Sequence, residues 1–149
     1  EVYVTSGSEE KIARAVELGA KGGALYSESS WRKKLSAEVP EGFDVIVDGA
    51  GGDGFGELAR LLGPAGRLAF YGGTRGKWPQ ILPQHLFFRQ VAILASTMGS
   101  PDDFAAMVEF VAKHGLVPVV DQNFALTDGA AAFAHLNAGS QFGKVVLTV

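Results

Sequence analysis

The stretch Phe43-Asp-Val-Ile-Val-Asp-Gly-Ala-Gly-Gly-Asp-Gly54 joins an almost continuously apolar run to a glycine-rich turn. Residues 55–62 follow with a helical pattern, which stops at Gly63-Pro64 because proline cannot continue the helical hydrogen bonds. A second β-rich run then covers residues 68–71. A strand, a turn, a helix and another strand in this order predict a βαβ unit with parallel strands.

The same alternation extends outward from this stretch. Further β-rich runs occupy residues 2–5, 24–26 and 91–94, with helical patterns between them. We therefore predict an α/β fold with a parallel sheet and helices on both faces. The runs at 43–47 and 91–94 are apolar almost throughout, so we expect both to be interior strands.

The most clearly marked helix begins at Ser100. This serine is an N-cap residue, Pro101 suits the first helical position, and Asp103 completes a capping-box-like pair. Apolar side chains recur on one face until Gly115, a residue that can end the helix in a left-handed conformation.

Another helix is predicted over residues 9–18. Its buried side is expected to comprise Ile12, Ala15, Val16 and Leu18.

The pattern changes after residue 115. Short β-rich runs at 117–120 and 124–126 precede an alanine-rich helix at 128–136 and a closing strand at 144–149. We do not interpret this tail as a regular βαβ unit. It is expected to run toward a neighbouring module.

The composition excludes several classes of protein. The chain has 149 residues, a formal net charge of −3, 47% hydrophobic residues and no cysteine. A chain of this kind suits a soluble globular domain, offers no basic face to a nucleic acid and has no apolar run near the length of a membrane span. We expect it to be cytoplasmic. The histidines are scattered, so no catalytic residue and no metal ligand is assigned; they are His85, His114 and His135.

Glycines after the run at 43–47 resemble a phosphate-binding turn before a helix. Asp48 and Asp53 argue against that role, because both would place negative charge beside a phosphate. The next β-rich run also ends in Tyr71-Gly72, without an acid to hold a ribose. We therefore expect these glycines to let the backbone pass close under a cofactor that is bound mainly elsewhere.

The end of the first β-rich run is more informative. Units specific for NAD place an aspartate or glutamate at this position, where it binds the ribose hydroxyls and repels a 2′-phosphate. Here Thr5 and Ser6 stand instead, followed by Ser8 at a helix start and by Lys11 one turn further along. These groups can bind the additional phosphate of NADP. The alternative is that Ser6 or Ser8 only caps the helix and Lys11 is solvated, and the residue types do not decide between them.

Taken in order, these pieces resemble the medium-chain dehydrogenase/reductase family, which includes zinc-type alcohol dehydrogenases and quinone oxidoreductases. The matching pieces span nearly the whole chain; they are residues 2–20, Tyr26, residues 43–51, residues 61–73 and the closing Gln141-Phe-Gly-Lys-Val-Val-Leu147. The resemblance implies a Rossmann-type fold. It also implies that residues 1–115 form a partial NADP-binding domain and that residues 116–149 return to a catalytic domain.

The family also suggests which residues hold the cofactor. Its members bind the 2′-phosphate of NADPH through a strand-end serine, a lysine and often a tyrosine, which correspond here to Ser6, Lys11 and Tyr26. Backbone after the later strands approaches the adenosine and the nicotinamide. The expected cofactor-binding residues are therefore Ser6, Gly7, Ser8, Lys11, Tyr26, Gly49, Ala50, Gly51, Tyr71, Gly72, Gly73, Thr97 and Met98.

The implied function is hydride transfer between NADPH and a carbonyl, alcohol, quinone or enone substrate. The family's usual first strand and its glycine fingerprint would precede Glu1, and zinc would belong only to a domain further upstream. We therefore expect a fragment with altered strand pairing or dimerisation, and a homodimer through residues 91–96. The alternatives are a Rossmann-like methyltransferase that binds S-adenosylmethionine through Asp48 and Gly49, and a non-catalytic nucleotide-binding or structural domain.

Overall fold

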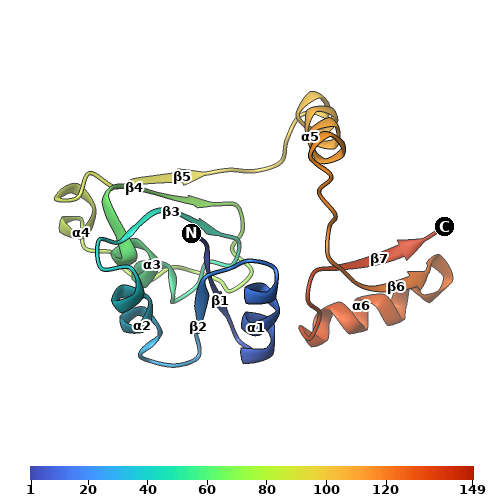
Figure 1. Cartoon of the computed structure of the whole chain (residues 1–149), viewed down its shortest axis with the longest axis horizontal. Coiled ribbons are helices and arrows are strands. Elements are labelled where there is room, and N and C mark those ends of the chain that lie inside the picture. Colours follow the sequence, from blue (N-terminus) through green and yellow to red (C-terminus); the bar gives the residue numbers. More distant parts are fainter. The chain divides into compact units, whose positions relative to one another are not determined.

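The computed structural model describes residues 1–149, which form two compact units, Glu1–Met98 and Gly99–Val149 (Figure 1). None of the helices is both long enough and apolar enough to cross a membrane.

The first unit alternates strands and helices, and every strand pair in it is parallel. This confirms the predicted α/β class with parallel strands flanked by helices. In chain order its elements are β1 (Tyr3–Ser6), α1 (Glu9–Glu17), β2 (Gly22–Leu25), α2 (Trp31–Glu38), β3 (Phe43–Asp48), α3 (Phe55–Leu61), β4 (Leu62–Phe70), α4 (Gln84–Phe87) and β5 (Ala92–Ala95).

The strands of the first unit do not form one sheet. Strand β1 pairs with β2, and β3, β4 and β5 form a separate sheet in that order. Strands β1 and β3 are not paired with each other, so the parallel strands of this unit are divided between β1 and β3. Strand β5 forms the other edge of its sheet, and a homodimer through this edge stays a prediction.

The prediction that the runs at 43–47 and 91–94 are interior strands is wrong. Both β3 and β5 are edge strands, and β4 lies between them. The register of β3 shifts between Phe43 and Val45, so that Phe43 and Ile46 both pack against the core. The side chains of Val45 and Val47 are 57% and 66% exposed, because no helix of this unit covers their face.

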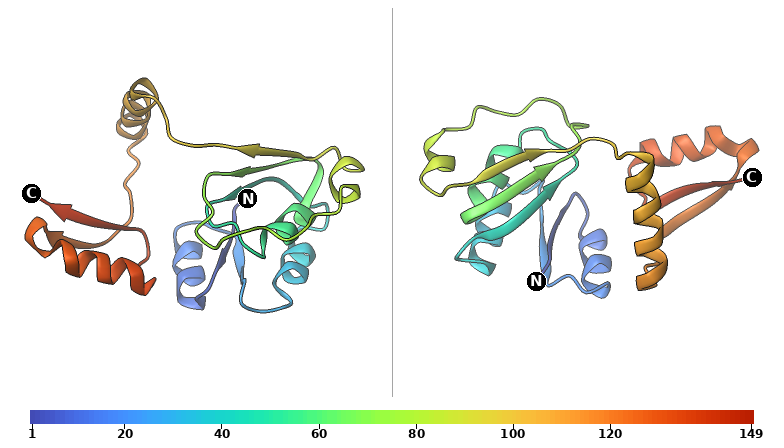
Figure 2. Two further views of the ribbon diagram at one scale, coloured as in Figure 1. Left: turned by 180° about the vertical axis from the view of Figure 1, so that it is seen from behind. Right: turned by 90° about the horizontal axis from the view of Figure 1, so that it is seen from above.

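Helices lie on opposite sides of the β1–β2 pair, with α1 on one side and α2 on the other (Figures 1 and 2). No bounds were predicted for helix α2, because its only buried apolar side chains are Trp31 and Leu35, one helical turn apart among charged neighbours. These side chains pack with Ala24 and Leu61 in one core cluster. Phe55 and Leu62 belong to a second cluster, so the junction of α3 with β4 contributes to both.

The second unit contains a parallel βαβ arrangement. Its elements are α5 (Pro101–His114), β6 (Val120–Ala125), the short 3-10 helix η1 (Leu126–Asp128), α6 (Gly129–Ala138) and β7 (Lys144–Thr148). Strands β6 and β7 are parallel, so the interpretation of the tail as irregular is wrong. The sequence of β6 is largely polar, so it lacks the apolar pattern that predicts a strand. The Asp121 carboxylate in β6 accepts a 2.8 Å hydrogen bond from the Phe142 backbone N–H and so connects β6 to the segment before β7.

The capping of α5 is confirmed. The Ser100 hydroxyl accepts from the Asp103 backbone N–H at 3.1 Å, and the Asp103 carboxylate accepts from the Ser100 backbone N–H at 2.8 Å. Gly115 ends the helix with a φ of 61°. The expected burial of an apolar face is only partly seen. Ile12 and Ala15 of α1 are half-buried, whereas Val16 and Leu18 are exposed. Phe104 and Met107 of α5 are also exposed.

The capping box makes the start of α5 sensitive to acid. Hydrogen bonds from the Ser100 backbone and then from its hydroxyl lower the pKa of the Asp103 carboxyl. A lowered pKa in the folded state means that the cap stabilises α5 above the unfolded pKa of about 4 and loses this effect as pH falls through the folded value. We expect amide protection in the first turn of α5 to decline below about pH 4. Hydrogen exchange measured against pH checks this, with Asp103→Asn as the control that lacks the dependence.

Candidate cofactor-binding site

The predicted cofactor-binding residues lie at or after the carboxyl ends of the parallel strands, or in the first turn of α1. A ligand of a parallel sheet normally binds outside these ends. Ser6 ends β1, Ser8 caps α1, Lys11 lies in the first turn of α1, and Tyr26 directly follows β2. The remaining residues follow the strands of the other sheet; they are Gly49, Ala50 and Gly51 after β3, Tyr71, Gly72 and Gly73 after β4, and Thr97 and Met98 after β5.

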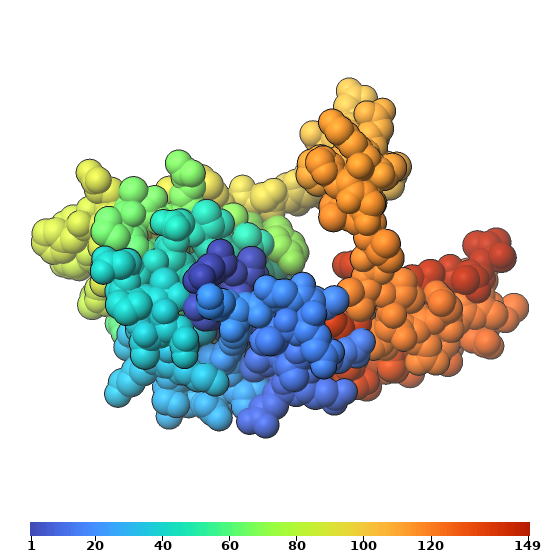
Figure 3. All heavy atoms as spheres, viewed as in Figure 1, coloured from blue at the N-terminus to red at the C-terminus, as the bar shows by residue number.

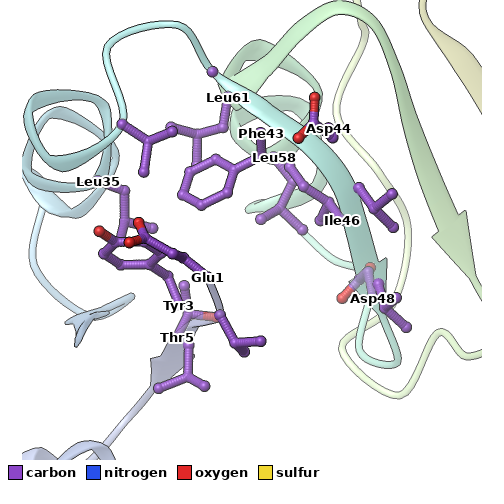
Figure 4. Close-up of a pocket in the computed structure, with 16 residues that line it drawn as sticks. Glu1, Tyr3, Thr5, Leu35, Phe43, Asp44, Ile46, Asp48, Leu58 and Leu61 are labelled. Carbon is purple, nitrogen blue, oxygen red and sulfur yellow. The ribbon is translucent and has the colours of Figure 1, made fainter. Parts of the chain in front are cut away.

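A cavity of about 870 Å³ separates β1 from β3. Residues 1–5 line one side, residues 43–48 line the other, and α2 and α3 contribute leucine side chains (Figure 4). Tyr3 and Phe43 meet edge to face across it, with their ring centroids 5.7 Å apart. The N-terminal residues beside the cavity lie on the surface of the first unit (Figure 3). Each bordering strand therefore leaves one hydrogen-bonding edge toward this cavity.

At the end of β1, serine hydroxyls order the start of α1. The Ser6 hydroxyl accepts from the Ser8 backbone N–H at 3.2 Å, and the Ser8 hydroxyl accepts from the Lys11 backbone N–H at 3.4 Å. Ser8 is thus the N-cap of α1, which agrees with the alternative that Ser6 or Ser8 caps the helix. The strand end itself carries no carboxylate, although the exposed Glu9 and Glu10 follow in the first turn of the helix.

Tyr26 lies close to this helix start. Its backbone N–H donates to the Ser6 carbonyl at 3.1 Å, and a Cβ atom on Gly7 would lie only 2.8 Å from its phenol oxygen. The absence of a side chain at Gly7 therefore lets the phenol approach. The guanidinium of Arg75 lies over the Tyr26 ring, with its central carbon 4.4 Å from the ring centroid. Sequence reasoning missed Arg75, although a cation in a loop after a parallel strand was a signal for it.

The turn after β3 does not present its amides to a ligand. The carboxylate of Asp48, whose residue is 8% exposed, accepts from the backbone N–H groups of Ala50 at 3.1 Å and Gly51 at 2.9 Å. The N–H of Gly52 donates to the Gly76 carbonyl at 3.3 Å. These amides are satisfied within the protein, which supports the interpretation of the turn as a surface for close backbone approach.

The loops after β3 and β4 pack tightly together. A Cβ atom on Gly72 would lie 2.3 Å from the carbonyl oxygen of Gly49, and one on Gly49 would lie 2.6 Å from the phenol oxygen of Tyr71. The Trp78 ring stacks on the buried Phe55 ring at a centroid distance of 3.9 Å and anchors the loop after β4. The structure therefore brings residues 49–51 and 71–73 together.

Thr97 and Met98 follow β5 beside the end of β4, where the Ser96 backbone N–H donates to the Phe70 carbonyl at 2.9 Å. Both follow β5 at the end of the first unit, and Met98 is 93% exposed. Neither one forms a hydrogen bond with another predicted cofactor-binding residue. Their approach to a nicotinamide stays a prediction.

The residues of this chain do not form a zinc site. No group of three or more histidine, aspartate or glutamate side chains is placed to hold a metal ion. His85 is paired with Arg60, with 3.3 Å between Nδ1 and the arginine Nε, and His135 Nε2 lies 2.7 Å from an Asp121 carboxylate oxygen.

Comparison with known proteins identifies the family. A family model described as zinc-binding dehydrogenase matches residues 18–147. The chain belongs to the zinc-binding dehydrogenase family. The resemblance to the medium-chain dehydrogenase/reductase family is thereby confirmed, and the methyltransferase alternative has no support in these comparisons.

Its relatives in this family are longer proteins. The zinc-type alcohol dehydrogenase-like protein YogA of Leptosphaeria maculans is 34% identical over 160 residues, which cover 99% of the chain and 44% of the relative. The quinone oxidoreductase-like protein 2 of Bos taurus is 25% identical over 99% of the chain and 45% of the relative. The chain thus spans a little under half the length of these relatives. A crystal structure of an NAD-dependent alcohol dehydrogenase superposes with a TM-score of 0.89 at 35% identity, covering 100% of the chain and 44% of that protein.

Proposed function

We propose that this chain holds NADP in an oxidoreductase that transfers hydride between NADPH and a small carbonyl, alcohol, quinone or enone substrate. Membership of the dehydrogenase family supports the reaction class. The observation that carries the choice of cofactor is the end of β1, where the Ser6 hydroxyl stands in place of a carboxylate, next to the start of α1.

The electrostatics of this strand end favour a phosphate. A 2′-phosphate carries close to two negative charges, which a carboxylate at the same position would repel. Ser6 and Ser8 offer neutral hydroxyls, and the amino end of α1 supplies a partial positive charge. Lys11 adds a full positive charge in the first turn of the helix. The residues present therefore fit the adenosine end of NADP.

The nicotinamide supplies the hydride chemistry when the cofactor is bound, and the chain supplies binding and orientation. The Cβ positions of Gly49 and Gly72 face the Tyr71 phenol and the Gly49 carbonyl, so these glycines let the loops after β3 and β4 pack directly on each other where two parallel strands end. We infer that the backbone of these loops approaches the bound cofactor. We assign no proton-transferring residue to this chain.

The competing cofactor is NAD. The alcohol dehydrogenase whose crystal structure superposes on this chain is described as NAD-dependent. If the intact protein binds neither dinucleotide, a non-catalytic role is favoured instead. Comparing NADPH with NADH on one preparation distinguishes these functions.

Replacing Ser6 by aspartate tests the proposed role of the strand end. The new carboxylate should repel the 2′-phosphate and weaken NADPH binding to the intact protein by at least about tenfold, while NADH binding stays equal or improves. Isothermal titration with each dinucleotide measures the two dissociation constants. Ser36→Asp, which places the same charge on α2, is the matched control and should change neither value by more than about twofold. Equal weakening of both cofactors by Ser6→Asp would contradict the proposal.

A further inference from the structure

Arg75 connects the two sheets of the first unit at their carboxyl ends. It lies in the loop after β4, yet its guanidinium stacks on Tyr26, which follows β2 in the other sheet. Arg75 takes part in none of the ion pairs of the structure, so no carboxylate neutralises it. An exposed arginine held without an acidic partner is available to an anionic ligand.

The backbone of Arg75 is fixed rather than loose. Its N–H donates to the Ala50 carbonyl at 2.9 Å, and the neighbouring Gly76 carbonyl accepts from the Gly52 N–H at 3.3 Å. A Cβ atom on Gly52 would lie 2.7 Å from the Cβ of Arg75, so the two loops pack directly on each other. The stacking of Trp78 on Phe55 anchors the same loop. The protein therefore directs this arginine toward Tyr26 through several independent contacts.

The position of Tyr26 shows what Arg75 faces. The phenol oxygen of Tyr26 lies against Gly7. Gly7 stands between Ser6 and Ser8, the two serines that order the start of α1. The guanidinium thus lies over a ring whose polar end reaches the proposed phosphate site. Stacking on an aromatic ring orients the planar guanidinium and leaves its edge N–H groups to bind two phosphate oxygens.

We propose that Arg75 is a specificity-determining residue that binds the 2′-phosphate of the adenosine ribose together with Lys11. This inference rests on the proposed function and extends it, because it adds a second cation from the opposite sheet. Two cations together match the charge of a phosphate, and a bidentate arginine adds directional hydrogen bonds. Tyr26 serves as the platform that orients Arg75.

The test compares binding of adenosine 2′,5′-bisphosphate with binding of adenosine 5′-monophosphate, which differ in the 2′-phosphate alone. Arg75→Gln in the intact protein should weaken the bisphosphate by about tenfold or more and the monophosphate by less than about twofold. Arg75→Lys keeps the charge but loses the planar fork, so it should recover only part of the lost affinity. Lys77→Gln removes an equal charge from the same loop and should have little effect.

The outcomes separate this inference from the proposed function. If the unmodified protein prefers the bisphosphate and Arg75→Gln keeps that preference, the role of Arg75 is overturned while the proposed function stands. Equal losses with Arg75→Gln and Lys77→Gln would also overturn it, because the effect would then be general electrostatics. If the unmodified protein shows no preference for the bisphosphate, both proposals fail. Unchanged thermal unfolding of the variants shows that each one is folded.

Discussion

Replacing Lys11 by alanine is expected to weaken NADPH binding to the intact protein by about tenfold to a hundredfold and NADH binding by less than about threefold. Lys11 stands in the first turn of α1, directly after the serines at the end of β1. A hydrogen bond to a charged phosphate contributes about 1.5–3 kcal/mol, which corresponds to this change in the dissociation constant. Alanine favours helix, so α1 should remain intact.

Lys21→Ala is the matched control for this change. Lys21 pairs with Glu1 at 2.9 Å, just before β2 and so at the opposite end of that strand from Tyr26. Its loss removes the same charge away from the proposed phosphate site and should leave both dissociation constants nearly unchanged. The role of Lys11 is contradicted if Lys11→Ala weakens NADPH and NADH to the same extent.

The largest structural effect is expected from Gly72→Ala. The new methyl group would lie 2.3 Å from the Gly49 carbonyl oxygen, a backbone atom that cannot move aside without separating β3 from β4. We expect a loss of about 3 kcal/mol in the free energy of unfolding, near the upper end for overpacking, together with weaker binding of both dinucleotides. Urea unfolding followed by circular dichroism measures the stability.

The adjacent residue supplies the control. A Cβ atom on Gly73 would meet no other atom within 4 Å, so Gly73→Ala should change the free energy of unfolding by less than about 1 kcal/mol. Similar losses in the two variants would show that flexibility of the loop, rather than the contact between Gly49 and Gly72, explains the effect.

Local sequence signals predicted much of the fold. The capping box of Ser100 and Asp103 and the left-handed Gly115 are interactions within one helix, and the structure has all of them. Strands β1 to β5 follow from short apolar runs, and their parallel pairing follows from the helices between them. The position of the predicted site residues at strand ends is a direct consequence of that order.

Long-range contacts account for the errors. Nothing in the apolar run at 43–47 shows that β3 lies at an edge, because this depends on which strand pairs with it. Asp48 is a different case, because its carboxylate makes local hydrogen bonds to the Ala50 and Gly51 amides, and these agree with the expectation that the turn is not the main phosphate site. A cation in a loop after a strand could mark Arg75 as a candidate, but the contact of Arg75 with Tyr26 joins residues from two sheets, so no local pattern predicts that contact.

We expect the polar groups at the end of β1 to select a dinucleotide with a phosphate on the adenosine ribose. The most direct test is the ratio of the dissociation constants of NADPH and NADH for the unmodified intact protein, measured by titration calorimetry at one ionic strength. We expect NADPH to bind at least about tenfold more tightly. Equal affinity, or tighter binding of NADH, would contradict the claim.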